Sequence, residues 1–145
     1  MIGLLQRVTT ASVAVGGETI GQIGQGLMVL VAVHRDDAER DIARLAERIL
    51  TYRVFPDAAG RMNRSVLDEC LGLLLVPQFT LAADTRKGTR ASFTKAAAPD
   101  KGEDYFGRLV DICRESLNAV ETGQFGATMQ VTLINDGPVT FWLET

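Results

Sequence analysis

The chain has few of the residues on which metal-dependent and disulfide-bonded proteins rely. Its 145 residues include two cysteines and one histidine. Cys70 and Cys113 are too few for a disulfide framework and stand at no metal-ligand spacing, so we expect buried free thiols. His34 alone cannot build a histidine-rich metal site, and no Gly-x-Ser-x-Gly elbow accompanies it for a serine triad. The sequence therefore predicts no metal and no cofactor.

Long hydrophobic runs are also missing. No segment approaches the roughly 20 apolar residues that a membrane span requires. The first residues, Met1 to Arg7, lack the basic start, the long apolar segment and the small-residue cleavage site of a signal peptide. We therefore expect a cytoplasmic protein with no membrane partner.

Positive charge is scarce overall but concentrated in one segment. Fifteen basic residues against 18 acidic ones give a net charge of −3, which excludes a protein that is basic throughout. Residues 85–95 nevertheless hold four cations and no acid: Arg86, Lys87, Arg90 and Lys95. Such a segment is either a solvated loop or a phosphate-binding loop, and charge alone does not separate these readings.

The length predicts one domain, residues 1–145, and the patterning predicts several strands. Residues 4–15 alternate, Gly16-Gly17 is a hairpin signal, and residues 18–23 form the return strand. Two uninterrupted apolar runs, 27–33 and 71–76, are typical of central strands buried on both faces. The sheet is therefore expected to have a fully covered centre.

Helical spacing appears twice. Asp36 and Glu39 indicate a capping box that opens a helix over residues 37–53. A second helix is predicted to begin near Asp100 and to end at Gly123, with a line of buried apolar side chains along one face as far as Val120. Half-buried strands follow on both sides of a turn at 135–138. The sum is an α/β domain of mixed α+β character, in which two main helices cover a mixed sheet.

The end of the second apolar run is the first place where chemistry is expected. Ligands in α/β sheets settle at strand ends, and Pro77 to Leu81 stands at such an end. Gln78 offers an amide, Thr80 offers a hydroxyl, and backbone N–H groups freed there could form an oxyanion hole. The alternative is an ordinary strand-to-loop transition whose polar groups face water.

The second such place is the segment from Asn135 to Thr140. It reads as a hairpin turn, but its Gly137-Pro138 bond is of the kind that adopts the cis form at low cost, about 0.5–1 kcal/mol. A cis bond there would turn two successive carbonyls to one side, where they could accept hydrogen bonds from an ammonium group. The residues permit this arrangement without requiring it.

At these residues the sequence resembles the D-aminoacyl-tRNA deacylase family. The family pattern combines Ser-Gln-Phe-Thr-Leu, a Lys-Gly-x-Arg-Pro-Ser-Phe loop and a late Gly-Pro-Val-Thr. The matching segments here are Gln78–Leu81, Lys87–Phe93 and Gly137–Thr140, joined by Gln6–Val8, Gly26–Val33, Met62–Val66 and Gly123–Met129. The match covers essentially the whole chain in order. Pro77 replaces the family serine and Ala91 replaces the loop proline.

The resemblance implies a homodimeric hydrolase that serves translation quality control. Its substrate would be the ester that joins a D-amino acid, or glycine, to the 3′-terminal adenosine of a tRNA. The resemblance assigns catalysis to Gln78, Phe79 and Thr80. It assigns substrate binding to Gly137, Pro138, Val139, Thr140 and Met129, with Arg7 bracing the motif, and RNA binding to Arg86, Lys87, Arg90 and Lys95.

The resemblance also implies how chirality is read. Gly137-Pro138, as a cis pair, would reach into the partner subunit's pocket, where its carbonyls would hold the α-amino group of the substrate. An L side chain would then collide with the pocket wall, whereas a hydrogen atom or a D side chain would not.

Alternatives concern the nucleophile and the class of protein. Water is favoured over Thr80 as nucleophile, because no base is evident beside the hydroxyl. A non-catalytic RNA-binding module using residues 85–95 is the main functional alternative. An unrelated small esterase is disfavoured by the missing elbow, triad and metal cluster. No role is predicted for His34.

Overall fold

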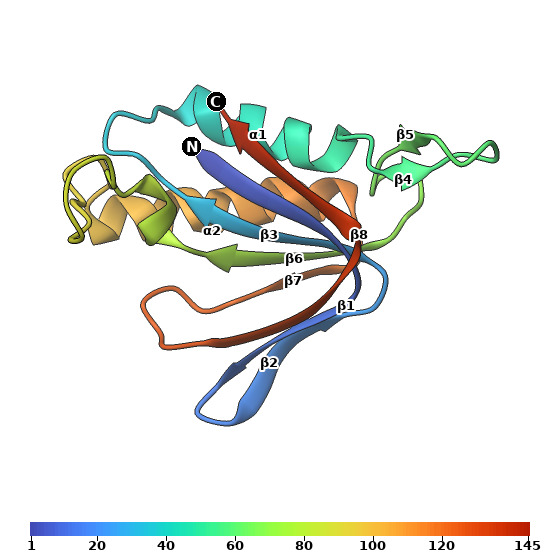
Figure 1. Ribbon diagram of the computed structural model, residues 1–145, viewed down its shortest axis with the longest axis horizontal. Coiled ribbons are helices and arrows are strands. Elements are labelled where there is room, and N and C mark those ends of the chain that lie inside the picture. The colour runs from blue at the N-terminus through green and yellow to red at the C-terminus, as the bar shows by residue number, and fades with distance from the viewer.

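Strand β1 (Ile2–Val15) organises the sheet because it pairs with three other strands. The computed structural model describes all of residues 1–145. Along one edge β1 pairs antiparallel with β3 (Gly26–Ala32) and then with β2 (Glu18–Ile23). Along the other edge it pairs antiparallel with β8 (Gln130–Glu144) over nearly its whole length. The two ends of the chain consequently lie side by side (Figure 1).

Parallel strands complete the sheet on the far side of β3. Strand β6 (Gly72–Pro77) pairs with β3, and β7 (Val120–Thr122) pairs with β6. Helix α1 (Glu39–Thr51) and a short hairpin, β4 (Phe55–Pro56) with β5 (Met62–Arg64), connect β3 to β6. Helix α2 (Pro99–Ser116) connects β6 to β7, and both helices lie on one side of the sheet (Figure 1). The mixed sheet with two helices is confirmed.

Two cores explain the uninterrupted apolar runs. Leu73 and Leu75 of β6 pack into the larger core, which includes side chains of both helices. Leu74 and Val76 pack into a second core on the opposite face, together with residues of β1 and β2. Because successive side chains of a strand point to opposite faces, a strand between two cores must be apolar at every position. The prediction that these strands are buried on both faces is confirmed.

Both helix boundaries differ from the sequence prediction. The Asp36–Glu39 capping box is wrong, because α1 begins at Glu39 and the Ala38 N–H donates to the Asp41 carboxylate at 2.8 Å. Helix α2 ends at Ser116, and Val120 lies in β7, where it pairs with Leu73. An apolar residue at that position fits a helix stripe and a buried parallel strand equally well, and strand pairing decides between them.

The predicted turn at 135–138 is instead an interruption within β8. Gln6 pairs with Thr140 and Val8 pairs with Asn135, so residues 136–139 bulge out opposite Arg7. The Asn135 side chain closes this bulge, since its Oδ1 accepts the Val139 N–H at 2.7 Å and its Nδ2 donates to the Val139 carbonyl at 3.1 Å. The Gly137-Pro138 peptide bond within the bulge is cis. We refer to residues 136–139 as the β8 bulge.

The two cysteines differ in environment. Cys113 is fully buried in the larger core, and burial raises the pKa of its thiol to about 12. Cys70 is exposed, so the prediction of a buried thiol is wrong at this position. It lies in a turn that follows polar residues 68 and 69, where the apolar stretch has not yet begun.

Neither helix combines the length and hydrophobicity needed to cross a lipid bilayer.

Because one cysteine is exposed and the other is buried, a thiol-reactive probe should react with only one thiol in the native protein. The thiolate is the reactive form, and at pH 8 the Cys113 thiol is both protonated and covered, whereas the Cys70 thiol is accessible. We expect one equivalent of Ellman's reagent to react rapidly and a second only after denaturation. Rapid reaction of both thiols in the folded protein would contradict the packing around Cys113.

Candidate functional site

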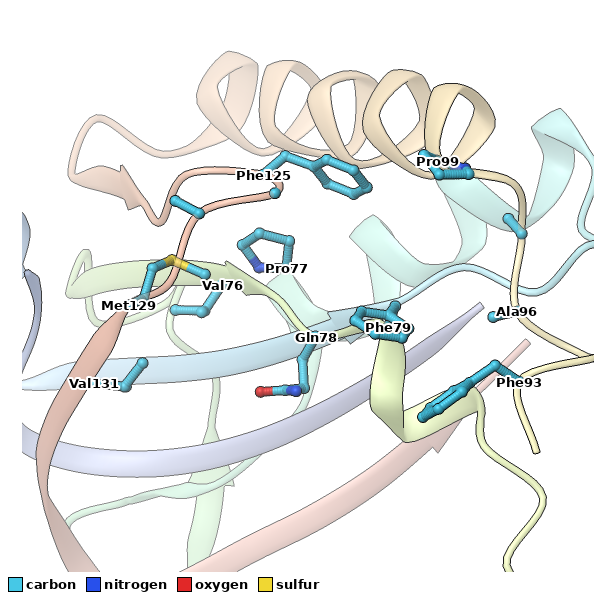
Figure 2. Close-up of a pocket in the computed structure, with 13 residues that line it drawn as sticks. Val76, Pro77, Gln78, Phe79, Phe93, Ala96, Pro99, Phe125, Met129 and Val131 are labelled. Atoms are coloured by element: carbon cyan, nitrogen blue, oxygen red, sulfur yellow. The ribbon is translucent and has the colours of Figure 1, made fainter. Parts of the chain in front are cut away.

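A pocket of about 590 Å³ opens where β6 ends (Figure 2). It lies between the end of β6, the start of α2, the segment that leads into β8 and the segment that follows residues 85–92. Its walls are mostly apolar and include Val76, Pro77, Phe79, Phe93, Phe125 and Met129, with Gln78 as the polar side chain. A largely apolar hollow with a few polar groups is the usual form of a small-molecule site.

The end of β6 leaves two backbone donors unpaired, one in Phe79, which lines the pocket, and one in the next residue, Thr80, which does not. The Gln78 N–H still donates to the Val31 carbonyl at 2.7 Å, so it is already used. Phe79 begins a short 3₁₀ helix, η1 (Phe79–Ala82). The first N–H groups of a helix have no partner within it, and those of Phe79 and Thr80 donate to no other acceptor in the chain. Of the three predicted catalytic residues, two therefore offer a free N–H.

Thr80 has no base beside its hydroxyl. Its Oγ1 accepts a hydrogen bond from the Gln78 side-chain amide, and no carboxylate, imidazole or amine bonds to it. His34 stands at the end of β3, where its backbone N–H donates to the Asp37 carboxylate at 2.6 Å. A side-chain amide cannot take up a proton at neutral pH, so the structure provides no group to activate Thr80 as a nucleophile.

Pro77 and Met129 both line the pocket, and both lie close to Gly123. A Cβ at Gly123 would lie 2.8 Å from the Met129 sulfur and 3.3 Å from the Pro77 ring, so no side chain fits between them. The Gln124 N–H donates to that sulfur at 3.3 Å. Pro77, which stands in place of the family serine, thus contributes an apolar surface to the pocket. Met129, which the resemblance assigns to substrate binding, also lines this pocket.

Two aromatic rings flank the mouth of the pocket: Phe79, which is a predicted catalytic residue, and Phe93, which is not a predicted site residue. Phe79 and Phe93 pack with ring centroids 5.1 Å apart, yet they remain 57% and 44% exposed. Phe93 belongs to the basic loop, residues 85–95, so this contact joins the loop to the pocket (Figure 2). Phe125 lines the opposite wall. In the sequence, Phe93 and Phe125 occur in the motifs Ser-Phe and Gly-Gln-Phe-Gly. These motifs alone do not indicate a catalytic or binding role.

The basic loop carries less free charge than the sequence indicated. Backbone hydrogen bonds between Asp84 and Ser92, at 2.8 and 3.0 Å, close the loop at its base. Asp84 lies just outside the acid-free segment, and its carboxylate pairs with the Arg86 guanidinium, which lowers the pKa of Asp84. Lys87 and Arg90 line a hollow with this pair, and neither they nor Lys95 engage a carboxylate. The loop therefore offers three unpaired cations rather than four.

The β8 bulge lies away from the pocket of its own chain. Arg7 holds it, because Arg7 Nε donates to the Asp136 carbonyl at 2.9 Å and Nη1 donates to the Val54 carbonyl at 2.6 Å. Arg7 pairs with Leu27 at the start of β3, whereas Pro77 pairs with Val31 near the end of β3. None of Gly137, Pro138, Val139 and Thr140 lines the pocket. The two predicted constellations thus lie near opposite ends of β3.

A family model and a curated relative both match this chain over nearly its whole length, and both are described as deacylases of D-aminoacyl-tRNA. A family model described as D-Tyr-tRNA(Tyr) deacylase matches residues 4–144. The D-aminoacyl-tRNA deacylase of Alkalilimnicola ehrlichii is 65% identical over 144 residues, which cover 99% of this chain and 96% of that protein.

Solved structures resemble the whole chain as well. A structure titled c-Myc DNA Unwinding Element Binding Protein has a TM-score of 0.96 at 38% identity and covers 100% of this chain and 99% of its own. A probable eukaryotic D-amino acid tRNA deacylase has a TM-score of 0.86 and covers 98% of this chain and 97% of its own. At 18% identity, the second structure shows a shared fold alone.

Proposed function

The chain belongs to the D-Tyr-tRNA(Tyr) deacylase family and is an enzyme that hydrolyses D-aminoacyl-tRNA, and we propose that it does so in the pocket at the end of β6. The two unpaired N–H groups of Phe79 and Thr80 are the observation that carries this assignment. The pocket volume lies within the range of small-molecule sites, and its mouth carries the two exposed rings. A 3′-terminal aminoacyl-adenosine is a ligand of suitable size and polarity.

The unpaired N–H groups of Phe79 and Thr80 stabilise the negative charge that develops on the ester carbonyl oxygen. Such donors are most effective when they are fixed before the reaction, and backbone groups at the start of η1 are fixed by the fold. One donor of this kind contributes about 10²- to 10³-fold to the rate in other hydrolases. The Gln78 side chain orients the Thr80 hydroxyl rather than supplying a third backbone donor.

Water is the nucleophile in this proposal. Covalent attack by Thr80 would need a neighbouring base, and its only side-chain partner is an amide. An aminoacyl ester is already activated, so positioning of water, charge stabilisation and the ribose 2′-hydroxyl of the substrate are sufficient help. The Thr80 hydroxyl then serves as a positioning group.

The β8 bulge acts on the pocket of a second subunit. Within one chain the two constellations are separated by the length of β3, so only another copy can bring Gly137 to a pocket. Strand β8 also pairs with β1 alone and exposes 58% of Ile134 and 50% of Trp142. Long edge strands with exposed apolar residues are surfaces that proteins cover. A two-fold symmetric homodimer covers them with the commonest assembly geometry.

Chirality is read by exclusion at this shared site. The backbone carbonyls of Gly137 and Pro138 hold the α-amino group of the substrate, with Val139, Thr140 and Met129 around it. With the amino group and the ester carbonyl both fixed, an L side chain meets the pocket wall. A D side chain points away from the wall and glycine has none, so glycyl-tRNA is also accepted.

The basic loop binds the tRNA backbone. Lys87, Arg90 and Lys95 hold no carboxylate and are available to phosphates, while Arg86 contributes less because Asp84 pairs with it. The Phe79–Phe93 contact places the loop beside the pocket mouth. A tRNA bound on the loop can therefore present its 3′ end to the pocket.

Replacing Thr80 with valine separates the two mechanisms. Thr80→Val keeps the β-branched shape and removes the hydroxyl. If Thr80 positions other groups, the loss is one hydrogen bond, about 0.5–1.5 kcal/mol or roughly tenfold in rate at most. Single-turnover deacylation of D-tyrosyl-tRNA measures the effect. A loss of about a thousandfold or more, in a variant with an intact fold, would identify Thr80 as the nucleophile.

Substrate chirality tests the exclusion proposal. We expect the protein to release D-tyrosine from D-tyrosyl-tRNA and glycine from glycyl-tRNA, and to leave L-tyrosyl-tRNA intact under the same conditions. Equal rates on the D and L esters would refute selection by collision. Binding of all three tRNAs without cleavage of any ester would instead indicate an RNA-binding module.

A further inference from the structure

A second basic surface lies at the end of α1, far from the loop at residues 85–95. Arg44, Arg48 and Arg53 line an open hollow of about 480 Å³ together with a single acid, Glu47. The chain as a whole carries a net charge of −3, so a group of three arginines around one hollow is a local excess of positive charge on an acidic protein. We refer to this surface as the α1 arginine hollow.

The charge of this hollow is only partly neutralised. Arg44 pairs with Glu47 at 2.6 Å, and both side chains are 60% exposed. Arg48 donates to the backbone carbonyl of Glu144 at 2.6 Å, an acceptor without charge. Arg53 makes no hydrogen bond or ion pair through its side chain. Among the side chains that line the hollow, three guanidinium groups thus stand against one carboxylate, although Asp68 lies near enough to Arg53 for their charges to interact. An excess of guanidinium groups is the arrangement that attracts phosphate groups.

The hollow adjoins the β8 bulge. Its wall includes Tyr52 and Phe141, whose rings pack with centroids 5.3 Å apart. Phe141 follows the Gly137–Thr140 motif directly in β8. Arg7 binds both the Asp136 carbonyl in the bulge and the Val54 carbonyl, next to Arg53. The hollow is therefore linked to the bulge through Phe141 in β8 and through Arg7.

We propose that the α1 arginine hollow binds phosphates of the tRNA whose 3′ end occupies the partner subunit's pocket. This inference rests on the proposed function, in which the bulge reaches that pocket and carries the neighbouring hollow to its side. Each tRNA would then contact the basic loop of one subunit and α1 of the other. Arginine suits this role because its guanidinium binds phosphate oxygens in pairs.

The test compares full-length tRNA with the shortest substrate that still carries the ester. The double variant Arg44→Gln/Arg53→Gln removes two cations and leaves the Arg48 bond to β8 in place. The affinity for deacylated tRNA is measured at several salt concentrations. The slope of log affinity against log salt should fall by about two phosphate contacts. Single-turnover rates on D-tyrosyl-tRNA and on the D-tyrosyl ester of adenosine should diverge, with the tRNA rate falling about tenfold more.

Two single variants calibrate the measurement. Lys87→Gln, in the basic loop, should lower the salt slope by about one contact. Arg114→Gln should leave it unaltered, because Arg114 is an exposed arginine in the last turn of α2 with no ion pair and lies on another element. An equal effect of Arg114→Gln and the double variant would mean that only overall charge matters, and would overturn the proposal.

Two further results would overturn it. The first is a double variant whose salt slope and substrate ratio match those of the unaltered protein. The second is equal loss on both substrates together with dissociation in sedimentation, which would make the hollow a contact between subunits. Failure of the proposed function looks different, because Gly137→Ala would then leave the cleavage of D-tyrosyl-tRNA and the selectivity for the D ester unaltered.

Discussion

The antiparallel pairing of β1 with β8 is the constraint on which the arrangement of this protein depends. It runs nearly the full length of both strands and breaks at one place, opposite Arg7. There the Arg7 guanidinium, only 14% exposed, holds the Asp136 carbonyl and carboxylate and the Val54 carbonyl. Intact pairing on both sides of the break fixes where the bulge leaves the sheet. Arg7 and Asn135 fix its shape.

A second constraint follows from the parallel strands. Strands β3 and β6 are covered on both faces and β6 is paired on both sides. The backbone can therefore offer unpaired groups to a ligand where β6 ends, at Pro77. The N–H groups of Phe79 and Thr80 are such groups, and the side chains beside them are apolar. The bulge and this strand end lie at opposite ends of β3. Under the proposed function, a site that uses both is therefore built from two chains.

Features with a local cause could be predicted from the sequence, and features set by distant partners could not. The apolar runs predicted buried strands because burial on two faces leaves no alternative composition, and Gly16-Gly17 predicted the hairpin because both residues adopt positive φ. The bulge was read as a turn because only pairing with β1 distinguishes the two. Likewise, the carboxylate that neutralises Arg86 comes from Asp84, just outside the acid-free segment. The Gln78 N–H is not free for a ligand, because it donates to the Val31 carbonyl on another strand.

Mixing two defective subunits tests most directly the claim that the site belongs to two chains. Ala127→Trp fills the pocket, and Gly137→Ala disrupts the bulge because its Cβ would lie 2.5 Å from the Val139 side chain. Each variant alone should be inactive on D-tyrosyl-tRNA. After subunit exchange, each mixed dimer has one intact pocket facing one intact bulge, so about a quarter of the normal rate should return. A mixture that stays inactive although mixed dimers form, or a Gly137→Ala protein that keeps full activity and selectivity for the D ester, would contradict the account.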